Sequence, residues 1–138
     1  MARSFLSWVL ESDHNLNIRC KTTVLLHLIK VNELAEIFVE RRGFNKIEGW
    51  LRVECIKNDQ VAYNVIAMCW VLSYHEFSLV YFADYALNII EYVQKILDYY
   101  NKEKIVRIVC MLFENLKEDK ECLDHLCMIN ALNLVIKL

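Results

Sequence analysis

The stretch that indicates the fold most directly is 58–74, NDQVAYNVIAMCWVLSY. It opens with Asn58 and Asp59, residue types that favour a helix N-cap, and the positions that follow are apolar on nearly every side of a helix. A helix that is apolar all round is buried between neighbouring elements. We therefore predict a buried helix over 60–74 in an all-α fold.

Two shorter helices are expected before this buried one. The first covers 32–42, ends in Arg41 and Arg42, and is followed by Gly43, a residue suited to a left-handed C-terminal cap. The second covers 44–56, and its apolar face consists of Ile47, Leu51 and Ile56. A short, a medium and a long helix in this order are typical of an armadillo repeat.

The same pattern returns with a period of about 42 residues. Asn45, Asn88 and Asn130 mark the period, each after a small or apolar pair and before an apolar helical run. Armadillo and HEAT repeats have periods of about 40 to 47 residues. We predict a single all-α domain, a right-handed armadillo/HEAT-type α-solenoid of about three repeats with uncapped ends. Its expected units are 1–31, 32–76, 77–117 and a partial unit, 118–138.

The other units contain weaker helix signals. The expected helices are 77–85, 88–100 and 104–116, the last capped by 101–103, with 5–10 and 23–29 before the central unit and 121–128 and 130–138 after it. The β-branched run 105–109 leaves a strand as an alternative. Apolar residues crowd both ends of the sequence, and solenoid ends need a polar cap. We therefore expect the chain to belong to a longer solenoid or to be covered by a partner.

Composition narrows the function classes. The 138 residues are 57% hydrophobic and include two Gly and no Pro, which excludes disorder and collagen-like or linker-like chains. A net charge of -2 provides no overall basic field, so nucleic acid is not an expected partner. The longest uncharged stretch, 60–75, is shorter than the roughly 20 apolar residues of a membrane span. We expect no direct membrane insertion, no secretory signal and a cytosolic location.

No constellation of catalytic or metal-binding residues emerges. The only glycines, Gly43 and Gly49, are isolated, so no phosphate-binding loop is expected, and no serine or cysteine lies in a nucleophile elbow. The six cysteines lie among apolar residues, as buried free thiols do. One cluster has metal-ligand residue types, Cys122, His125 and Cys127, but these positions do not share one helix face. We expect no metal, no cofactor and no catalytic residues.

Two groups of cations are candidates for partner binding. Arg41 and Arg42, with Lys46 nearby, lie at a helix end, where cations favour the helix dipole and a purely structural role is the simpler interpretation. The second group, Lys102, Lys104 and Arg107, gathers near a helix start, where cations are unfavourable to the helix dipole. Cations that are retained in spite of this energetic cost indicate a role in binding. The expected partner-binding residues are Lys102, Lys104, Arg107, Arg41 and Arg42.

Peptide binding on the concave face of the solenoid is a second possibility. Nuclear-import adaptors bind peptides through Trp and Asn on successive third helices. Trp70 occupies the Trp position here, but Tyr74 replaces the Asn, and Asn115 is accompanied by Met111 instead of Trp. Neither unit therefore carries the complete pair of Trp and Asn, so Trp70 is interpreted as a packing residue. An unrelated armadillo or HEAT adaptor that binds a peptide or helix stays as the alternative function.

Several segments resemble one family. They are 31–33 (VNE), 38–40 (FVE), Gly43, 70–74 (WVLSY), 102–108 (KEKIVRI) and 113–116 (FENL). In this order, over about 5–138, they resemble the later armadillo units in the N-terminal domain of the H subunit of the V-type proton-pumping ATPase (V-ATPase). The most specific segment is KEKIVRI. Family members are several times longer, with earlier repeats and a C-terminal domain associated with silencing the ATPase, so a fragmentary or pared-down version without that role is expected.

The resemblance implies a function for the chain. It implies a non-catalytic component that docks to the E and G subunits of the peripheral stalk and to other subunits of the complex. It also implies support for the coupling of ATP hydrolysis to proton transport. The implied location is the cytosolic face of acidified organelle membranes.

Overall fold

A computed structural model of the chain describes residues 2–11 and 17–128, and of His125 and Met128 it describes the backbone. The described part is all-helical and contains no strand. Its helices are α1 (Ala2–Glu11), α2 (Ile18–Leu28), α3 (Asn32–Glu40), α4 (Gly43–Arg52), α5 (Glu54–Lys57), α6 (Asp59–Ser73), α7 (Glu76–Tyr99), α8 (Glu103–Leu116) and α9 (Lys120–Met128). The strand alternative for 105–109 is wrong, because these residues lie within α8. The helix expected at 130–138 lies outside the described residues.

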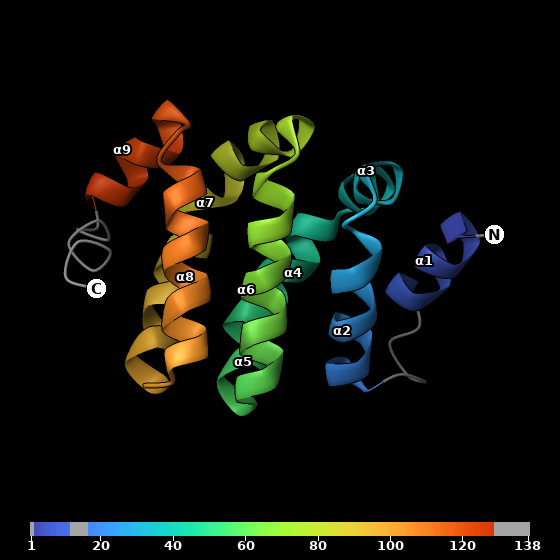
Figure 1. Cartoon of the computed structure of the whole chain (residues 1–138), viewed down its shortest axis with the longest axis horizontal. Helices are drawn as coiled ribbons and strands as arrows, with labels where there is room; N and C mark the ends of the chain where they lie inside the picture. The colour runs from blue at the N-terminus through green and yellow to red at the C-terminus, as the bar shows by residue number, and fades with distance from the viewer. Residues whose placement is uncertain (1, 12–16, 129–138) are drawn as a thin grey trace.

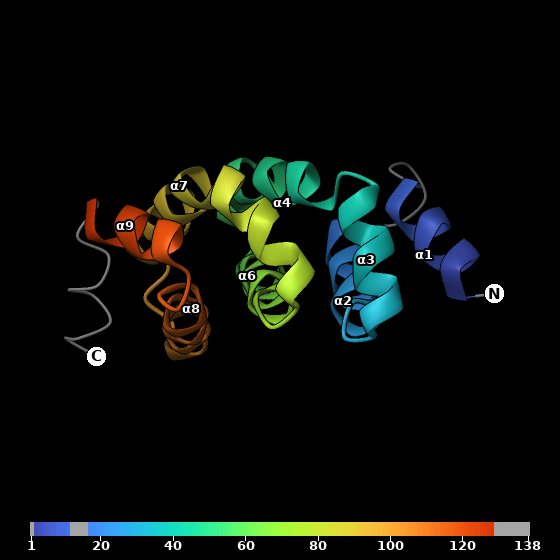
Figure 2. The same ribbon diagram turned by 90° about the horizontal axis from the view of Figure 1, so that it is seen from above.

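The helices form two rows along a curved arc. Three of them, α2, α6 and α8, stand side by side (Figure 1). Seen from above, α4 and α7 lie along the outer side of the arc and α2, α6 and α8 along the inner side (Figure 2). This arrangement confirms the all-α class and is compatible with an α-solenoid.

The central helix of the inner row is α6. Its side-chain cap is Asn58, whose Oδ1 accepts hydrogen bonds from the backbone N–H groups of Gln60 and Val61 at 2.9 and 3.1 Å. It packs between α2 and α8, and apolar residues around its circumference are buried. These residues are Val61, Ala62, Val65, Ile66, Met68, Cys69 and Leu72. The sequence prediction for this segment is confirmed, since burial on all sides follows from its neighbours on all sides.

Aromatic packing joins the two outer helices. The ring of Phe44 in α4 meets the ring of Phe82 in α7 edge-on, with ring centroids 4.7 Å apart. The Phe44 ring also stacks on Tyr85 at 5.8 Å. Both phenylalanines are fully buried. The edge-to-face arrangement is the favoured geometry for such pairs and fixes how α4 and α7 cross.

The turn between α3 and α4 differs from the prediction. The left-handed residue is Arg42, with φ 62°, and Gly43 is the first residue of α4. Gly43 is required for another reason: a Cβ atom there would overlap the ring of Phe38 and lie 2.6 Å from the backbone oxygen of Phe38. The absent side chain therefore lets α4 begin directly against the end of α3.

Two of the expected helix boundaries are wrong. The helix expected over 44–56 is divided at Val53 into α4 and α5, so that Cys55 is buried and Ile56 is 37% exposed. The helices expected at 77–85 and 88–100 are one continuous helix, α7. Neither Gly nor Pro occurs between them, and the good helix formers Ala86 and Leu87 continue the backbone hydrogen bonds. The helix expected over 104–116 begins at Glu103, and its N-cap residue, Lys102, makes no side-chain cap.

Hydrogen bonds between helices link residues separated by the period of the sequence. Asn64 donates to Thr22, and Asn115 donates to Ser73, each 42 positions earlier. Tyr85 donates to Asn45, 40 positions earlier. The sequence period of about 42 residues therefore matches the sequence separation of residues that contact one another between helices.

Burial differs among the cysteines and among the apolar residues near the N-terminus, although the cysteines were all expected to be buried. Cys55, Cys69 and Cys122 are buried, Cys110 is half-buried, and Cys20 and Cys127 are exposed, because these last two lie on solvent-facing sides of α2 and α9. In α1, Leu6 and Val9 are buried, whereas Phe5 and Trp8 are exposed and stack on one another. Within 2–11 and 17–128, no helix is long and apolar enough to cross a membrane.

Candidate functional site

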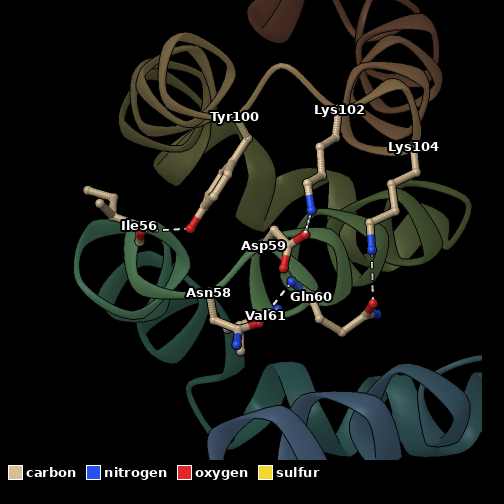
Figure 3. A network of polar contacts seen from close by, with 8 residues as sticks. All are labelled: Ile56, Asn58, Asp59, Gln60, Val61, Tyr100, Lys102 and Lys104. Atoms are coloured by element: carbon tan, nitrogen blue, oxygen red, sulfur yellow. Dashed lines mark hydrogen bonds and ion pairs between the residues drawn. The ribbon is translucent and has the colours of Figure 1, made fainter.

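The start of α8 reaches back to the start of α6 and forms a polar junction (Figure 3). The ammonium group of Lys102 pairs with the carboxylate of Asp59. Lys104 donates from Nζ to Oε1 of Gln60 at 3.0 Å. Tyr100 donates from its hydroxyl to the backbone oxygen of Ile56 at 2.6 Å. The side chains of Tyr100, Lys102 and Lys104 therefore connect the segment around the start of α8 to α5 and α6.

The backbone explains why these side chains point that way. Tyr100 follows α7 and Lys102 precedes α8, and both have extended φ and ψ values. Side chains along an extended segment alternate in direction, so Tyr100 and Lys102 share a side. Lys104 lies in the first turn of α8. Asp59 lies in the first turn of α6, where a carboxylate is favourable to the helix dipole.

The electrostatics of this junction are mixed. The pKa of the Asp59 carboxyl is lowered, first by the hydrogen bond from Lys102 and further by the positive charges of Lys102 and Lys104. Arg107 pairs with Glu103 on the same helix. Exposed ion pairs of this kind contribute little to stability, so a partner could exchange them at little cost.

Lys104 differs from the other two cations in the group that it contacts. It donates to the neutral amide oxygen of Gln60, and its Nζ lies 5.7 Å from the centroid of the Tyr63 ring. An open depression of about 140 Å³ is lined by Tyr63, Lys104, Arg107, Ile108 and Met111. Lys104 and Arg107 thus lie beside an aromatic and an apolar surface, whereas Lys102 pairs with Asp59.

The first group of cations lies elsewhere. Arg41 pairs with Glu11 of α1 at 2.8 Å, and both side chains are exposed. Arg42 is exposed and holds the left-handed turn before α4. In the part of the chain that is described, no interaction links this group to the start of α8. The two groups are therefore separate surfaces.

The chemistry of the cysteines and histidines does not suggest a reaction. Burial raises the pKa of the Cys69 thiol to about 12, and it is the first cause of the same value at Cys122. Such thiols stay protonated and are poor nucleophiles. Of the metal candidates, Cys122 is buried and Cys127 is exposed, and the side chain of His125 lies outside the described atoms. Over the described ranges, no group of three or more His, Cys, Asp or Glu could hold a metal ion.

The asparagines of the inner row are engaged inside the protein. Asn64 is 2% exposed, donates to the hydroxyls of Thr22 and Thr23, and accepts from the amide of Gln60. Asn115 donates to the hydroxyl of Ser73 at 2.8 Å. Trp70 is half-buried and meets Tyr74 edge-on at 5.4 Å, as a packing residue would. Sequence analysis missed Asn64, although one amide in an apolar helix was a visible signal.

These features define the class of protein: an all-helical arc that is compatible with an α-solenoid. A family profile for the H subunit of V-ATPases matches residues 1–138. The chain therefore belongs to the V-ATPase H subunit family, through its N-terminal domain, and the resemblance noted in the sequence is confirmed. No solved structure matches the chain at a significant level.

Proposed function

We propose that the chain is a non-catalytic component of the V-type proton-pumping ATPase that acts as its H subunit does. In this role it docks to the E and G subunits of the peripheral stalk, contacts other subunits of the complex, and supports the coupling of ATP hydrolysis to proton transport. It would act on the cytosolic face of acidified organelle membranes. The observation that carries the proposal is the family match over residues 1–138.

The architecture that we propose for this role is a right-handed solenoid of about three armadillo-type repeats. The units are those expected from the sequence, 1–31, 32–76, 77–117 and 118–138, in one domain. Support comes from the hydrogen bonds that join helices across 40 to 46 positions, since equivalent places in successive units meet at that spacing. A surface of stacked units presents one row of helices to a partner.

The docking surface that we propose is the start of α8, with Lys102, Lys104 and Arg107. Cations at this position oppose the helix dipole, and the hydrogen bond of Lys104 is to a neutral oxygen. An acidic segment of a stalk protein would complement them. Arg41 and Arg42, at the end of α3, form a second, separate contact in this proposal.

Binding of the purified chain to a reconstituted E–G heterodimer tests the proposal. We expect the double variant Lys104→Glu with Arg107→Glu to lose most of the binding, because attraction becomes repulsion. Lys95→Glu is the matched control, since Lys95 is an exposed cation of α7. Absence of binding by the unmodified chain would contradict stalk docking. Unchanged binding by a double variant with an intact helical spectrum would contradict only the choice of surface.

A further inference from the structure

We refer to the surface shared by α6 and α8 as the α6–α8 groove, and the depressions at its two ends have linings of opposite charge. The two helices run in the same direction, since Lys104 meets Gln60 at their starts and Asn115 meets Ser73 at their ends. The side chains along the solvent-facing stripe of α8 are Lys104, Arg107, Met111, Asn115 and, beyond its end, Glu118. The facing stripe of α6 includes Tyr63 and Trp70, and Tyr74 follows as its C-cap residue.

At each end of the groove, the charged side chains that line a depression are all of one sign. The lining at the start of α8 contains Lys104 and Arg107 and no carboxylate. At the other end, a depression of about 290 Å³ is lined by Ser73, Tyr74, Glu76, Leu79, Asn115, Glu118 and Asp119, with no cation. The 14 residues of α8 separate these ends by about 21 Å.

The charges of α8 oppose its own dipole. Lys102 and Lys104 lie at its start, and its last turn contains no cation. Glu103 and Lys117 offset this pattern in part, but they pair with Arg107 and Glu114 of the same segment. Stability alone would favour acids at the start and cations at the end. Proteins retain destabilising arrangements where function needs them, so the reversed order indicates a binding role.

Apolar and aromatic side chains accompany the charges along the groove. Met111 is 37% exposed and lines the first depression, Tyr74 is 64% exposed and lines the second, and half-buried Trp70 lies against Tyr74. Of the inner-row asparagines, Asn64 contacts α2 through Thr22 and Thr23, and Asn115, which lines the second depression, donates to Ser73. A helix pairs its own backbone groups internally and presents an apolar face to such a groove.

We propose that the α6–α8 groove binds an amphipathic helix of a partner protein that is acidic in its first turns and basic in its last turns. The acidic turns lie at Lys104 and Arg107, the apolar face covers Met111, Trp70 and Tyr74, and the basic turns lie at Glu76 and Glu118. The bound helix runs parallel to α8, because acids at its N-terminus and cations at its C-terminus also favour its own dipole. This inference rests on the proposed function, since it specifies the segment that the same surface receives.

Two peptides of identical composition test the direction of charge. Each is a fluorescein-labelled helix of about 15 residues with a leucine face, one with Glu in the first turns and Lys in the last, the other with these blocks exchanged. We expect the first to bind the purified chain about tenfold more tightly in a fluorescence anisotropy titration at low salt. Equal affinity of the two peptides would overturn the proposal.

A groove with reduced charge at both ends provides the matched control. In the double variant Lys104→Glu with Glu118→Lys, each depression gains one charge of the opposite sign, and both new charges favour the dipole of α8, so the variant is expected to fold. It should lose most of its preference for the first peptide. Tyr74→Ala and Met111→Ala should weaken both peptides equally, because they remove apolar contact only. A double variant that keeps the full original preference would overturn the assignment of these ends.

The outcome for this groove is separable from the outcome for stalk docking. If the chain binds the E–G heterodimer but does not discriminate between the peptides, the proposed function stands and the inference is wrong. If it discriminates between the peptides but does not bind E–G, the groove assignment stands and the stalk is not its partner.

Discussion

Asn64 of α6 donates its side-chain amide to the hydroxyl of Thr22 in α2, over 3.1 Å and 42 positions of sequence. The same amide donates to Thr23 at 3.0 Å, and its oxygen accepts from Gln60. The amide is almost completely buried, and every polar atom of it has a partner. It therefore specifies how the inner helices of neighbouring units align.

Removal of this amide should be costly. We expect Asn64→Ala to lower the free energy of unfolding by about 2 kcal/mol, because the buried hydroxyl of Thr22 loses a partner and a cavity remains. Urea unfolding followed by circular dichroism measures the change. Asn88→Ala is the control, since Asn88 is exposed and its contact with Glu48 is long, at 3.5 Å, so a change within about 0.5 kcal/mol is expected. Equal effects of the two substitutions would show that burial of Asn64 is not important.

Substitution of the two glycines by alanine should have opposite effects on the stability of the fold. Gly43→Ala places a methyl group against the ring and backbone oxygen of Phe38, and we expect it to destabilise the fold by about 3 kcal/mol. Gly49→Ala meets no atom within 4 Å inside α4, and we expect it to stabilise the fold by about 0.5 to 1 kcal/mol. Thermal unfolding of both variants measures this contrast. A stable Gly43→Ala variant would mean that α3 and α4 are not in this close contact.

Thiol reactivity should follow burial. We expect Cys20 and Cys127 to react promptly with a thiol reagent at neutral pH, Cys110 more slowly, and Cys55, Cys69 and Cys122 only on unfolding. Burial raises the pKa of Cys69 to about 12, which leaves almost no thiolate at neutral pH. Mass spectrometry of the labelled sites measures the order, and the same reaction in denaturant, where all six should react, is the control. Prompt labelling of Cys69 in the folded chain would contradict this account.

The ion pair between Asp59 and Lys102 should make the stability of the fold depend on pH in the acidic range. The pKa of Asp59 lies below its usual 3.8, so the carboxylate stabilises the fold above that pH, and this stabilisation is lost as the pH falls through the folded-state pKa. Lys102→Gln should raise the pKa of Asp59 in an NMR titration and weaken the pH dependence of unfolding below pH 3.8. Lys57→Gln, which alters a neighbouring exposed cation, should leave Asp59 unchanged. An unaltered Asp59 titration in the Lys102 variant would contradict the pairing.

Local patterns predicted the α6 segment well and the turns less well. The N-cap at Asn58 and the all-round apolar surface of 60–74 involve residues close in sequence, and both were confirmed. The left-handed residue was placed at Gly43 and occurs at Arg42, because contact between the Gly43 backbone and Phe38 decides where the glycine is needed. The break expected near Asn88 is absent, since no residue there interrupts the backbone hydrogen bonds of α7.

The candidate site was predicted as a set of charges. The cations Lys102, Lys104 and Arg107 were identified from their unfavourable position at a helix start. Arg107 pairs locally with Glu103, whereas the partners of Lys102 and Lys104 are Asp59 and Gln60, 43 and 44 positions earlier, and no local pattern connects residues at that distance. The acidic end of the groove at Glu76 and Glu118 combines two different corners of the chain, so it too requires the folded arrangement.

The sequence by itself determined the all-α class, the buried central helix and the period of about 42 residues, because each depends on the spacing of apolar and capping residues along one segment. Only the tertiary structure decided that Asn64 meets Thr22, that Gly43 lies against Phe38, and that α6 and α8 enclose a groove with opposite charge at its ends. These relationships depend on how separate helices pack, and packing joins side chains whose distance in the sequence carries no local signal.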